Sequence, residues 1–165
     1  MTAVVAQAAN FRPMQVADVD RVLAVEVQAY GFPWSRGNFI DSLAAGHWAE
    51  VMEDGDGGLI GYWLAMPAVD EVHLLNLTVA PAHQGQGHAR TLLDRLEARA
   101  REGGLASLWL EVRLSNERAQ RLYTRRGFVQ QGLRRGYYPA AASRREDAVV
   151  MSLALQEGAR ADAAG

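Results

Sequence analysis

The spacing of apolar residues in the first third of the chain predicts one strand and two helices. A short strand is expected near Phe11. Residues 16–29 then carry apolar side chains at helical spacing, and Gly31 follows them as a stop. The apolar positions of this helix are Val16, Val19, Val22, Leu23 and Val27. Ser35 is suited to be the N-cap of a second, short helix.

The middle of the chain predicts an antiparallel hairpin. Residues 47–53 and 59–68 read as two strands, and the glycine-rich and aspartate-rich residues 54–58 between them favour a tight turn. The apolar run over residues 74–79 predicts a further strand, which Pro81 stops.

Helical spacing resumes from about Ala89 and ends at Glu102, before two glycines. The buried-looking strand that follows, residues 107–112, is separated from its predecessor by this long helix, which predicts a parallel crossover unit. Ser115 is expected to cap a helix that runs to about Arg125 and stops at Gly127.

Two final strands are expected over residues 128–137 and 148–155. The pattern as a whole predicts an α/β fold of α+β character, with one central mixed sheet of about seven strands flanked by about four helices. We expect a single domain over residues 1–155 and a loose C-terminal tail over residues 156–165.

The amino-acid composition excludes several kinds of binding partner and catalytic group. The formal net charge is −2, so no general basic field draws the chain to nucleic acid or to an anionic membrane, and we expect it to bind neither directly. The chain contains neither Cys nor Lys, which excludes a cysteine nucleophile, thiolate metal sites and Schiff-base chemistry. Its four histidines lack a recognisable ligand spacing, so no metal site is expected. A cytoplasmic monomer fits these features.

The loop after the strand over residues 74–79 contains Gly85 and Gly87 and leads directly into a helix. The first backbone N–H groups of such a helix have no acceptor within it, so a phosphate or pyrophosphate can bind there. Neither a P-loop nor a dinucleotide fingerprint fits, because His88 stands where a P-loop has Lys and Arg90 where the fingerprint has Gly. A tight connection without a ligand explains the loop about equally well.

Two side chains are candidates for acid and base chemistry. Glu111 lies in an otherwise apolar strand, where an ionised group needs either a partner or a function, and Arg113 is one available partner. Tyr123 lies on the next helix, on one face with Asn116 and Ala119, and a core tyrosine would show the same spacing. A neutral amine, a carboxylate that accepts its proton and a phenol that donates one to a leaving thiolate are the parts of an acyl transfer.

Several motifs together resemble the RimI-type ribosomal-protein-alanine N-acetyltransferases of the GNAT superfamily, over about residues 11–155. The motifs are Phe-Pro-Trp-Ser at 32–35, Gln-Gly-Gln-Gly at 84–87, Leu-Trp-Leu-Glu-Val-Arg at 108–113, Ser-Asn at 115–116, Leu-Tyr at 122–123, Gly-Phe at 127–128, Tyr-Tyr-Pro at 137–139 and Arg-Glu-Asp-Ala at 145–148. The resemblance implies the GNAT fold and transfer of acetyl from acetyl-CoA to the N-terminal alanine of the eighteenth protein of the small ribosomal subunit.

The resemblance also implies a role for each matching residue. Glu111 matches the family's general base and Tyr123 its general acid. The residues implied to bind acetyl-CoA are Leu77, Thr78, Val79, Gly85, Gln86, Gly87, His88, Ala89, Arg90 and Asn116. Gly85 and His88 depart from the usual pattern, in which a basic and an apolar residue stand at these two positions.

The acceptor is the least defined part of this hypothesis. Phe32, Trp34, Tyr137 and Tyr138 are candidates for the walls of a peptide groove, with Asp70 or Glu71 facing a basic side chain of the substrate; core and surface turns explain them equally well. Two alternative functions stay open, namely transfer to other protein N-termini or a small amine, and acyl-coenzyme binding without catalysis.

Overall fold

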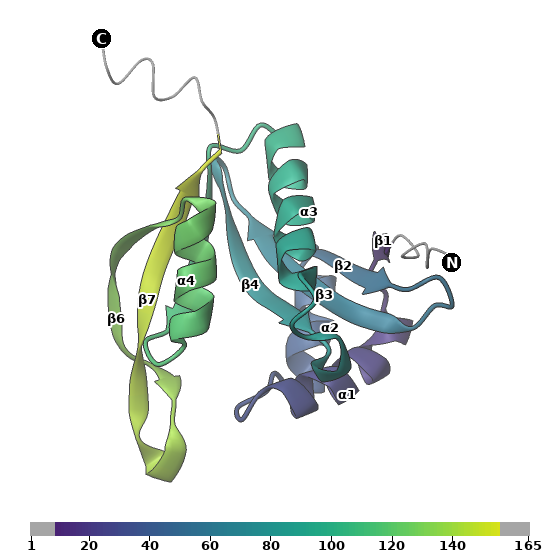
Figure 1. The fold of residues 1–165 in the computed structure, drawn as a ribbon, viewed down its shortest axis with the longest axis horizontal. Coiled ribbons are helices and arrows are strands. Elements are labelled where there is room, and N and C mark those ends of the chain that lie inside the picture. Colours follow the sequence, from purple (N-terminus) through teal and green to yellow (C-terminus); the bar gives the residue numbers. More distant parts are fainter. Residues whose placement is uncertain (1–8, 156–165) are drawn as a thin grey trace, which may run out of the picture. The chain divides into compact units, whose positions relative to one another are not determined.

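The computed structural model describes residues 9–155. Their seven strands form one mixed sheet in the order β1-β2-β3-β4-β5-β7-β6, and four α-helices accompany it (Figure 1). The predicted fold class and these numbers of elements are confirmed. The predicted tail over residues 156–165 lies outside the described residues.

The observed helices and strands lie close to those predicted from the sequence. The strands are β1 Asn10–Pro13, β2 Trp48–Glu53, β3 Leu59–Pro67, β4 Glu71–Val79, β5 Ser107–Arg113, β6 Val129–Pro139 and β7 Arg145–Ala154. The α-helices are α1 Val19–Ala29, α2 Arg36–Ala44, α3 His88–Glu102 and α4 Glu117–Arg126, and three short 3-10 helices are η1 Val16–Asp18, η2 Pro81–His83 and η3 Ala141–Ser143.

The described residues cluster into two compact units. Unit 1 takes in the described part of Met1–Ala65 together with Asn76–Asp94, and unit 2 takes in Met66–Leu75 and the described part of Arg95–Gly165. Strand β4 and helix α3 each contribute residues to both units.

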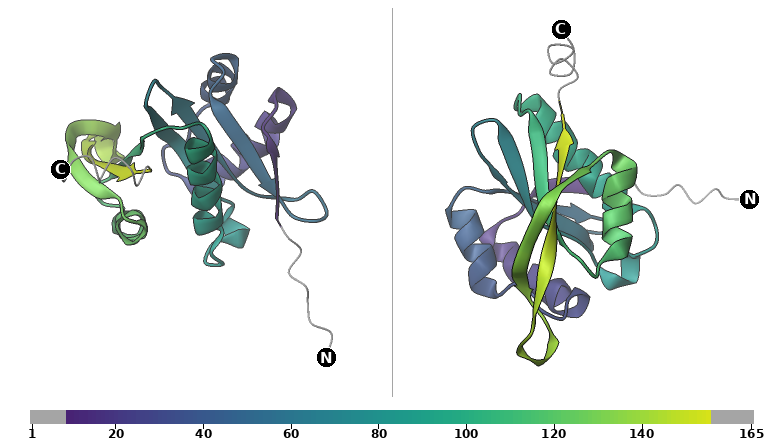
Figure 2. Two further views of the ribbon diagram at one scale, coloured as in Figure 1. Left: turned by 90° about the horizontal axis from the view of Figure 1, so that it is seen from above. Right: turned by 90° about the vertical axis from the view of Figure 1, so that its left-hand side faces the viewer.

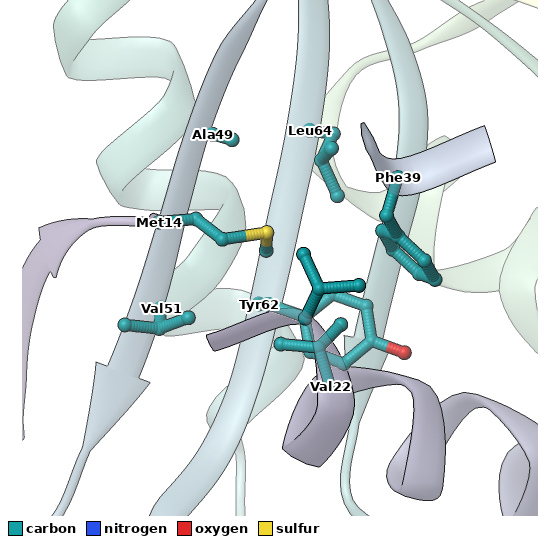
Figure 3. Packing of buried hydrophobic residues seen from close by; sticks show 8 residues of the cluster. Met14, Val22, Phe39, Ala49, Val51, Tyr62 and Leu64 are labelled. Carbon is teal, nitrogen blue, oxygen red and sulfur yellow. The ribbon is translucent and has the colours of Figure 1, made fainter. Parts of the chain in front are cut away.

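Unit 1 is built on the predicted antiparallel hairpin of β2 and β3, with β1 paired antiparallel to β2. Helices α1 and α2 contribute side chains to a buried cluster with these strands, which Figure 3 shows from close by. The buried members are Met14, Val19, Val22, Phe39, Ala49, Val51, Tyr62 and Leu64. Ser35 caps α2 as predicted, because its hydroxyl oxygen accepts from the Asn38 N–H at 3.1 Å.

The buried face of α1 differs from the predicted one. Val19 and Val22 are buried, but Val16 and Val27 are more than half exposed. The third buried residue of the helix is Glu26, which continues the row from Val19 and Val22 at the spacing i, i+3, i+7. The prediction from apolar residues alone was wrong here, because a buried carboxylate takes a place that the pattern assigned to valine.

Unit 2 contains the predicted parallel pair. Strand β4 pairs parallel with β5 over Glu71–His73 and Ser107–Trp109, and this strand begins three residues before the predicted start. β7 pairs antiparallel with β5 over the whole length of β5. β6 lies outside β7, and Figures 1 and 2 show these two strands as a long ribbon in green and yellow. The last strand therefore inserts between β5 and β6.

Helix α4 begins one residue later than expected. Its N-cap is Asn116, whose side-chain oxygen accepts from the Ala119 N–H at 3.1 Å, so the prediction of Ser115 as the cap was wrong. Asn is as good a cap as Ser, and two adjacent candidates cannot be separated by propensity alone. The helix ends as predicted at Gly127, which has φ +103°.

Gly61 on β3 packs directly against the main chain of β4. A Cβ atom at this position would lie 2.5 Å from the Thr78 carbonyl oxygen and 3.2 Å from Leu92 Cδ1. We predict that Gly61→Ala lowers the free energy of unfolding by about 2 kcal/mol, because main chain must shift to admit the methyl group. Urea denaturation measures the change.

The matched control is Gly132→Ala on β6, where a Cβ atom would meet nothing within 4 Å. Its free energy of unfolding should change by less than about 0.5 kcal/mol. Equal losses in the two variants would contradict the argument from close packing.

Candidate active site

In unit 1, the end of β4 is followed by a short turn and the glycine loop. Gly85 and Gly87 have φ of +78° and +84°, a region that side chains with a Cβ rarely adopt. A Cβ atom at either position would meet nothing within 4 Å, so the backbone faces open space. The loop therefore requires glycine for its conformation and leaves room for a ligand beside it.

Helix α3 starts at His88, immediately after this loop. The first N–H groups of an α-helix have no acceptor within it, and the helix dipole places partial positive charge at the same end. In this turn the Thr91 N–H bonds back to the Gly87 carbonyl at 3.4 Å. The main chain from Gly85 to Arg90 thus has the form and polarity of an anion-binding loop.

The last residues of β4 hold their main chain through side-chain bonds. The Tyr30 hydroxyl donates to the Leu77 carbonyl at 3.1 Å, and Gln84 Nε2 donates to the Val79 carbonyl at 3.2 Å. Thr78 between them is buried. The pairing of β4 with β5 ends at His73, so the main-chain groups of β4 after this residue take no part in hydrogen bonds of that pairing.

A buried polar network, which the sequence analysis missed, lies behind this part of β4. Glu26 accepts from Asn76 Nδ2 at 2.7 Å and from the Tyr62 hydroxyl at 3.0 Å, and the Trp34 N–H is a further donor to it. Burial raises the pKa of Glu26, and these donors oppose that shift. The sequence feature that could have revealed this network is the presence of two polar residues, Asn76 and Thr78, within an apolar run.

In unit 2, Glu111 lies on β5, where successive side chains point to opposite faces of the sheet. Leu110 and Val112 are buried, whereas the Glu111 side chain is 16% exposed. Its Oε1 lies 3.6 Å from Nε of Arg134 on β6. Arg113, the partner considered from the sequence, donates to the Pro139 carbonyl at 2.8 Å and to Glu146 at 3.4 Å. Glu111 is thus a partly accessible carboxylate beside a guanidinium group.

Tyr123 is half-buried on α4, and its ring centroid lies 5.4 Å from that of Phe128. The ring therefore packs at the end of its own helix. Asn116, implied to contact the coenzyme, uses its side-chain oxygen for the helix cap.

The Tyr-Tyr segment of β6 sits in a bulge that charged side chains hold in place. The pairing of β6 with β7 shifts register between Arg134 and Tyr138, and the Arg145 side chain donates to the carbonyls of Gly136 and Tyr137. The two tyrosine rings pack edge to face at 4.9 Å. Burial, followed by the charge of Glu111, raises the pKa of Tyr138 to about 12.

The remaining groove candidates divide between core and surface. Trp34 packs on the buried Phe39 with ring centroids 5.1 Å apart, whereas Phe32 is 47% exposed. Asp70 is exposed, and Glu71 lies 3.2 Å from His73 Nε2. Trp34 therefore contributes to the core of unit 1, and Phe32 remains accessible.

Within residues 9–155, no three His, Cys, Asp or Glu side chains gather where they would hold a metal ion. Over the same residues, no helix has the length and apolar character required to cross a membrane.

This fold is characteristic of the acetyltransferases. The chain belongs to the acetyltransferase (GNAT) family, whose model matches residues 19–128. This match confirms the predicted enzyme class.

Individual relatives agree with that assignment. The chain is 38% identical over 138 residues to the [Ribosomal protein bS18]-alanine N-acetyltransferase of Haemophilus ducreyi, covering 84% of this chain and 94% of the relative. The crystal structure of the ribosomal-protein-S18-alanine N-acetyltransferase from Escherichia coli superposes with a TM-score of 0.84 at 32% identity, covering 90% of this chain and 95% of that one. These matches confirm the resemblance to RimI-type enzymes.

The fold is also found in solved structures of lower sequence identity. One is yncA from Salmonella typhimurium, whose structure contains acetyl-CoA; its TM-score is 0.72 at 24% identity, covering 91% of this chain and 95% of that one.

Proposed function

We propose that this chain transfers acetyl from acetyl-CoA to the N-terminal alanine of ribosomal protein bS18. The observation that carries the proposal is the 38% identity, over 84% of this chain and 94% of the relative, to a protein named for this activity. We further propose that residues 1–155 act as a single domain, as a monomer in the cytoplasm, without direct contact to nucleic acid.

The glycine loop fits the diphosphate of the coenzyme. Main-chain N–H groups from Gly85 to Arg90 supply donors, the positive φ of both glycines shapes the loop, and open space lies beside them. We assign Gly85, Gln86, Gly87, His88, Ala89 and Arg90 to the diphosphate, and Leu77, Thr78 and Val79 to the pantetheine arm. Acetyl-CoA supplies the activated acetyl thioester. Asn116 is a weaker assignment, because its side-chain oxygen already caps α4.

Glu111 is the proposed general base. An N-terminal amine has a pKa near 8, so roughly a tenth of it is neutral at pH 7. The neutral nitrogen becomes positively charged as it attacks the thioester, and a base that removes a proton from it speeds transfer. Glu111 lies in a strand, which fixes its backbone, and it is 16% exposed, which allows contact through water. Nε of Arg134 on β6 lies 3.6 Å from its Oε1.

Tyr123 is the proposed general acid. Direct transfer releases a thiolate, which must take up a proton to leave as a thiol, and a phenol can supply one. Packing against Phe128 fixes the ring. The absence of Cys from the chain is consistent with direct transfer rather than a thioester-linked enzyme.

Acceptor recognition is proposed for exposed aromatic residues. Phe32 in unit 1 and Tyr137 in unit 2 are 47% and 42% exposed, so each can contact an extended peptide. The bulge that holds Tyr137 is fixed by Arg145, which limits the entropy lost when a peptide binds. Asp70 is exposed and can meet a basic side chain of the substrate.

We predict that Glu111→Gln lowers kcat by about a hundredfold at neutral pH while coenzyme A still binds, because general base catalysis contributes roughly this factor. Steady-state kinetics and calorimetry give the two quantities. The matched control is Glu117→Gln, the same change at a side chain that is 80% exposed on α4. Unchanged turnover in Glu111→Gln would remove this residue from the mechanism.

Tyr123→Phe should slow release of the coenzyme thiol by about tenfold or more and leave thermal stability nearly unchanged, because the ring and its contact with Phe128 remain. Single-turnover thiol detection and a melting curve measure the two effects. A variant that unfolds at lower temperature and retains its rate per folded molecule would instead assign Tyr123 a packing role.

The acceptor is tested with synthetic peptides. The protein is incubated with acetyl-CoA and a panel of N-terminal peptides, including the bS18 sequence, together with a polyamine, and mass spectrometry reads each product. Acetylation of the bS18 peptide above all others is expected. Preference for the polyamine would favour a small-amine acetyltransferase, and coenzyme binding without any product would favour a non-catalytic acyl-coenzyme sensor.

A further inference from the structure

The buried network of unit 1 continues from Glu26 to the main chain of β4. Asn76 donates through Nδ2 to Glu26 and accepts through Oδ1 from the Thr78 hydroxyl at 2.7 Å. The Tyr30 hydroxyl lies 2.8 Å from Thr78 Oγ1 and 3.1 Å from the Leu77 carbonyl. Three side chains, those of Asn76, Thr78 and Tyr30, therefore connect the buried Glu26 carboxylate to the main chain of the strand proposed to bind the pantetheine arm.

The Thr78 and Asn76 side chains both donate hydrogen bonds in the direction of Glu26. The Tyr30 hydroxyl carries one proton, which it donates to the Leu77 carbonyl, and its oxygen also lies 2.8 Å from Thr78 Oγ1. The bond from Thr78 to Asn76 and the bond from Asn76 to Glu26 are aligned, and bonds aligned in this way strengthen one another in a medium of low polarity. A carboxylate is the natural end of such a chain, because it accepts hydrogen bonds and donates none.

Tyr30 differs from the other members of the chain in its exposure. Glu26, Asn76 and Thr78 are each less than a tenth exposed, whereas Tyr30, the residue after the end of α1, is 41% exposed. Its ring is therefore not required to fill the core. Its hydroxyl instead contacts two consecutive residues of β4, one through a side chain and one through a carbonyl.

We propose that Tyr30 is a positioning residue for coenzyme binding, whose hydroxyl fixes the orientation of Leu77 and Thr78 through the chain that ends at Glu26. The proposal rests on the proposed function, in which these residues contact the pantetheine arm. A rotated Leu77 peptide would turn its N–H and C=O groups away from the directions that a bound coenzyme requires, and Tyr30 holds that peptide by its oxygen.

The test is Tyr30→Phe, which removes one hydroxyl and keeps the ring. The dissociation constant of coenzyme A, measured by calorimetry, and KM for acetyl-CoA should both rise about fivefold, the effect of about one hydrogen bond. KM for the peptide should stay within twofold, and the melting temperature should change little. Unchanged coenzyme affinity, or a loss that follows the melting temperature, would overturn the proposal.

Tyr62→Phe is the matched control. It removes a hydroxyl that donates to the same Glu26 at 3.0 Å and also bonds to the Thr78 side chain, but from a fully buried ring and without the bond to the Leu77 carbonyl that Tyr30 makes. We expect a lower melting temperature with coenzyme affinity within twofold of the unsubstituted protein. If both variants lose affinity equally, the network is structural and Tyr30 has no particular role.

A double-mutant cycle with Thr78→Val separates a connected chain from two independent contacts. Once Tyr30→Phe has broken the chain, Thr78→Val should add less than a twofold loss of coenzyme affinity, and fully multiplicative effects would contradict the chain. Calorimetry with coenzyme A needs no acceptor. If the unsubstituted protein binds coenzyme A but acetylates no peptide, the proposed function fails while the role of Tyr30 is still tested.

Discussion

A buried carboxylate sets the main constraint on unit 1. Removing an ionised group from water costs several kcal/mol unless donors surround it, and Glu26 is 1% exposed. Its donors come from three separate places, namely Tyr62 on β3, Asn76 on β4 and the main chain of Trp34 before α2. Satisfying this one group therefore fixes α1, the hairpin, the end of β4 and the turn into α2 together.

The same constraint explains why two polar residues interrupt the buried face of β4. Val72 and Leu74 are followed on that face by Asn76 and Thr78, and all four are buried. An apolar pair at these positions would leave Glu26 without its β4 donor. The strand thus loses some hydrophobic burial and gains a fixed orientation in the segment that leads to the glycine loop.

In unit 2, the order of the strands determines which side chains lie close to one another. Because β7 inserts between β5 and β6, residues far apart in sequence come to lie on adjacent strands. Arg134 thereby reaches to within 3.6 Å of Glu111, and Arg113 stacks over the Tyr138 ring at 4.5 Å. The charge around the proposed base is therefore set by β6, a strand that is not its immediate neighbour.

The sequence by itself determined most of the elements and the glycine loop, because apolar periodicity, caps and positive-φ glycines are local properties. Gly85, Gly87 and Gly127 have positive φ, as their places in the pattern required. Only the tertiary structure decided which residues meet. It buried Glu26 in place of Val27, gave the cap of α4 to Asn116 and put Arg134 beside Glu111. Such pairings depend on strand order and on donors from distant segments, which no local pattern contains.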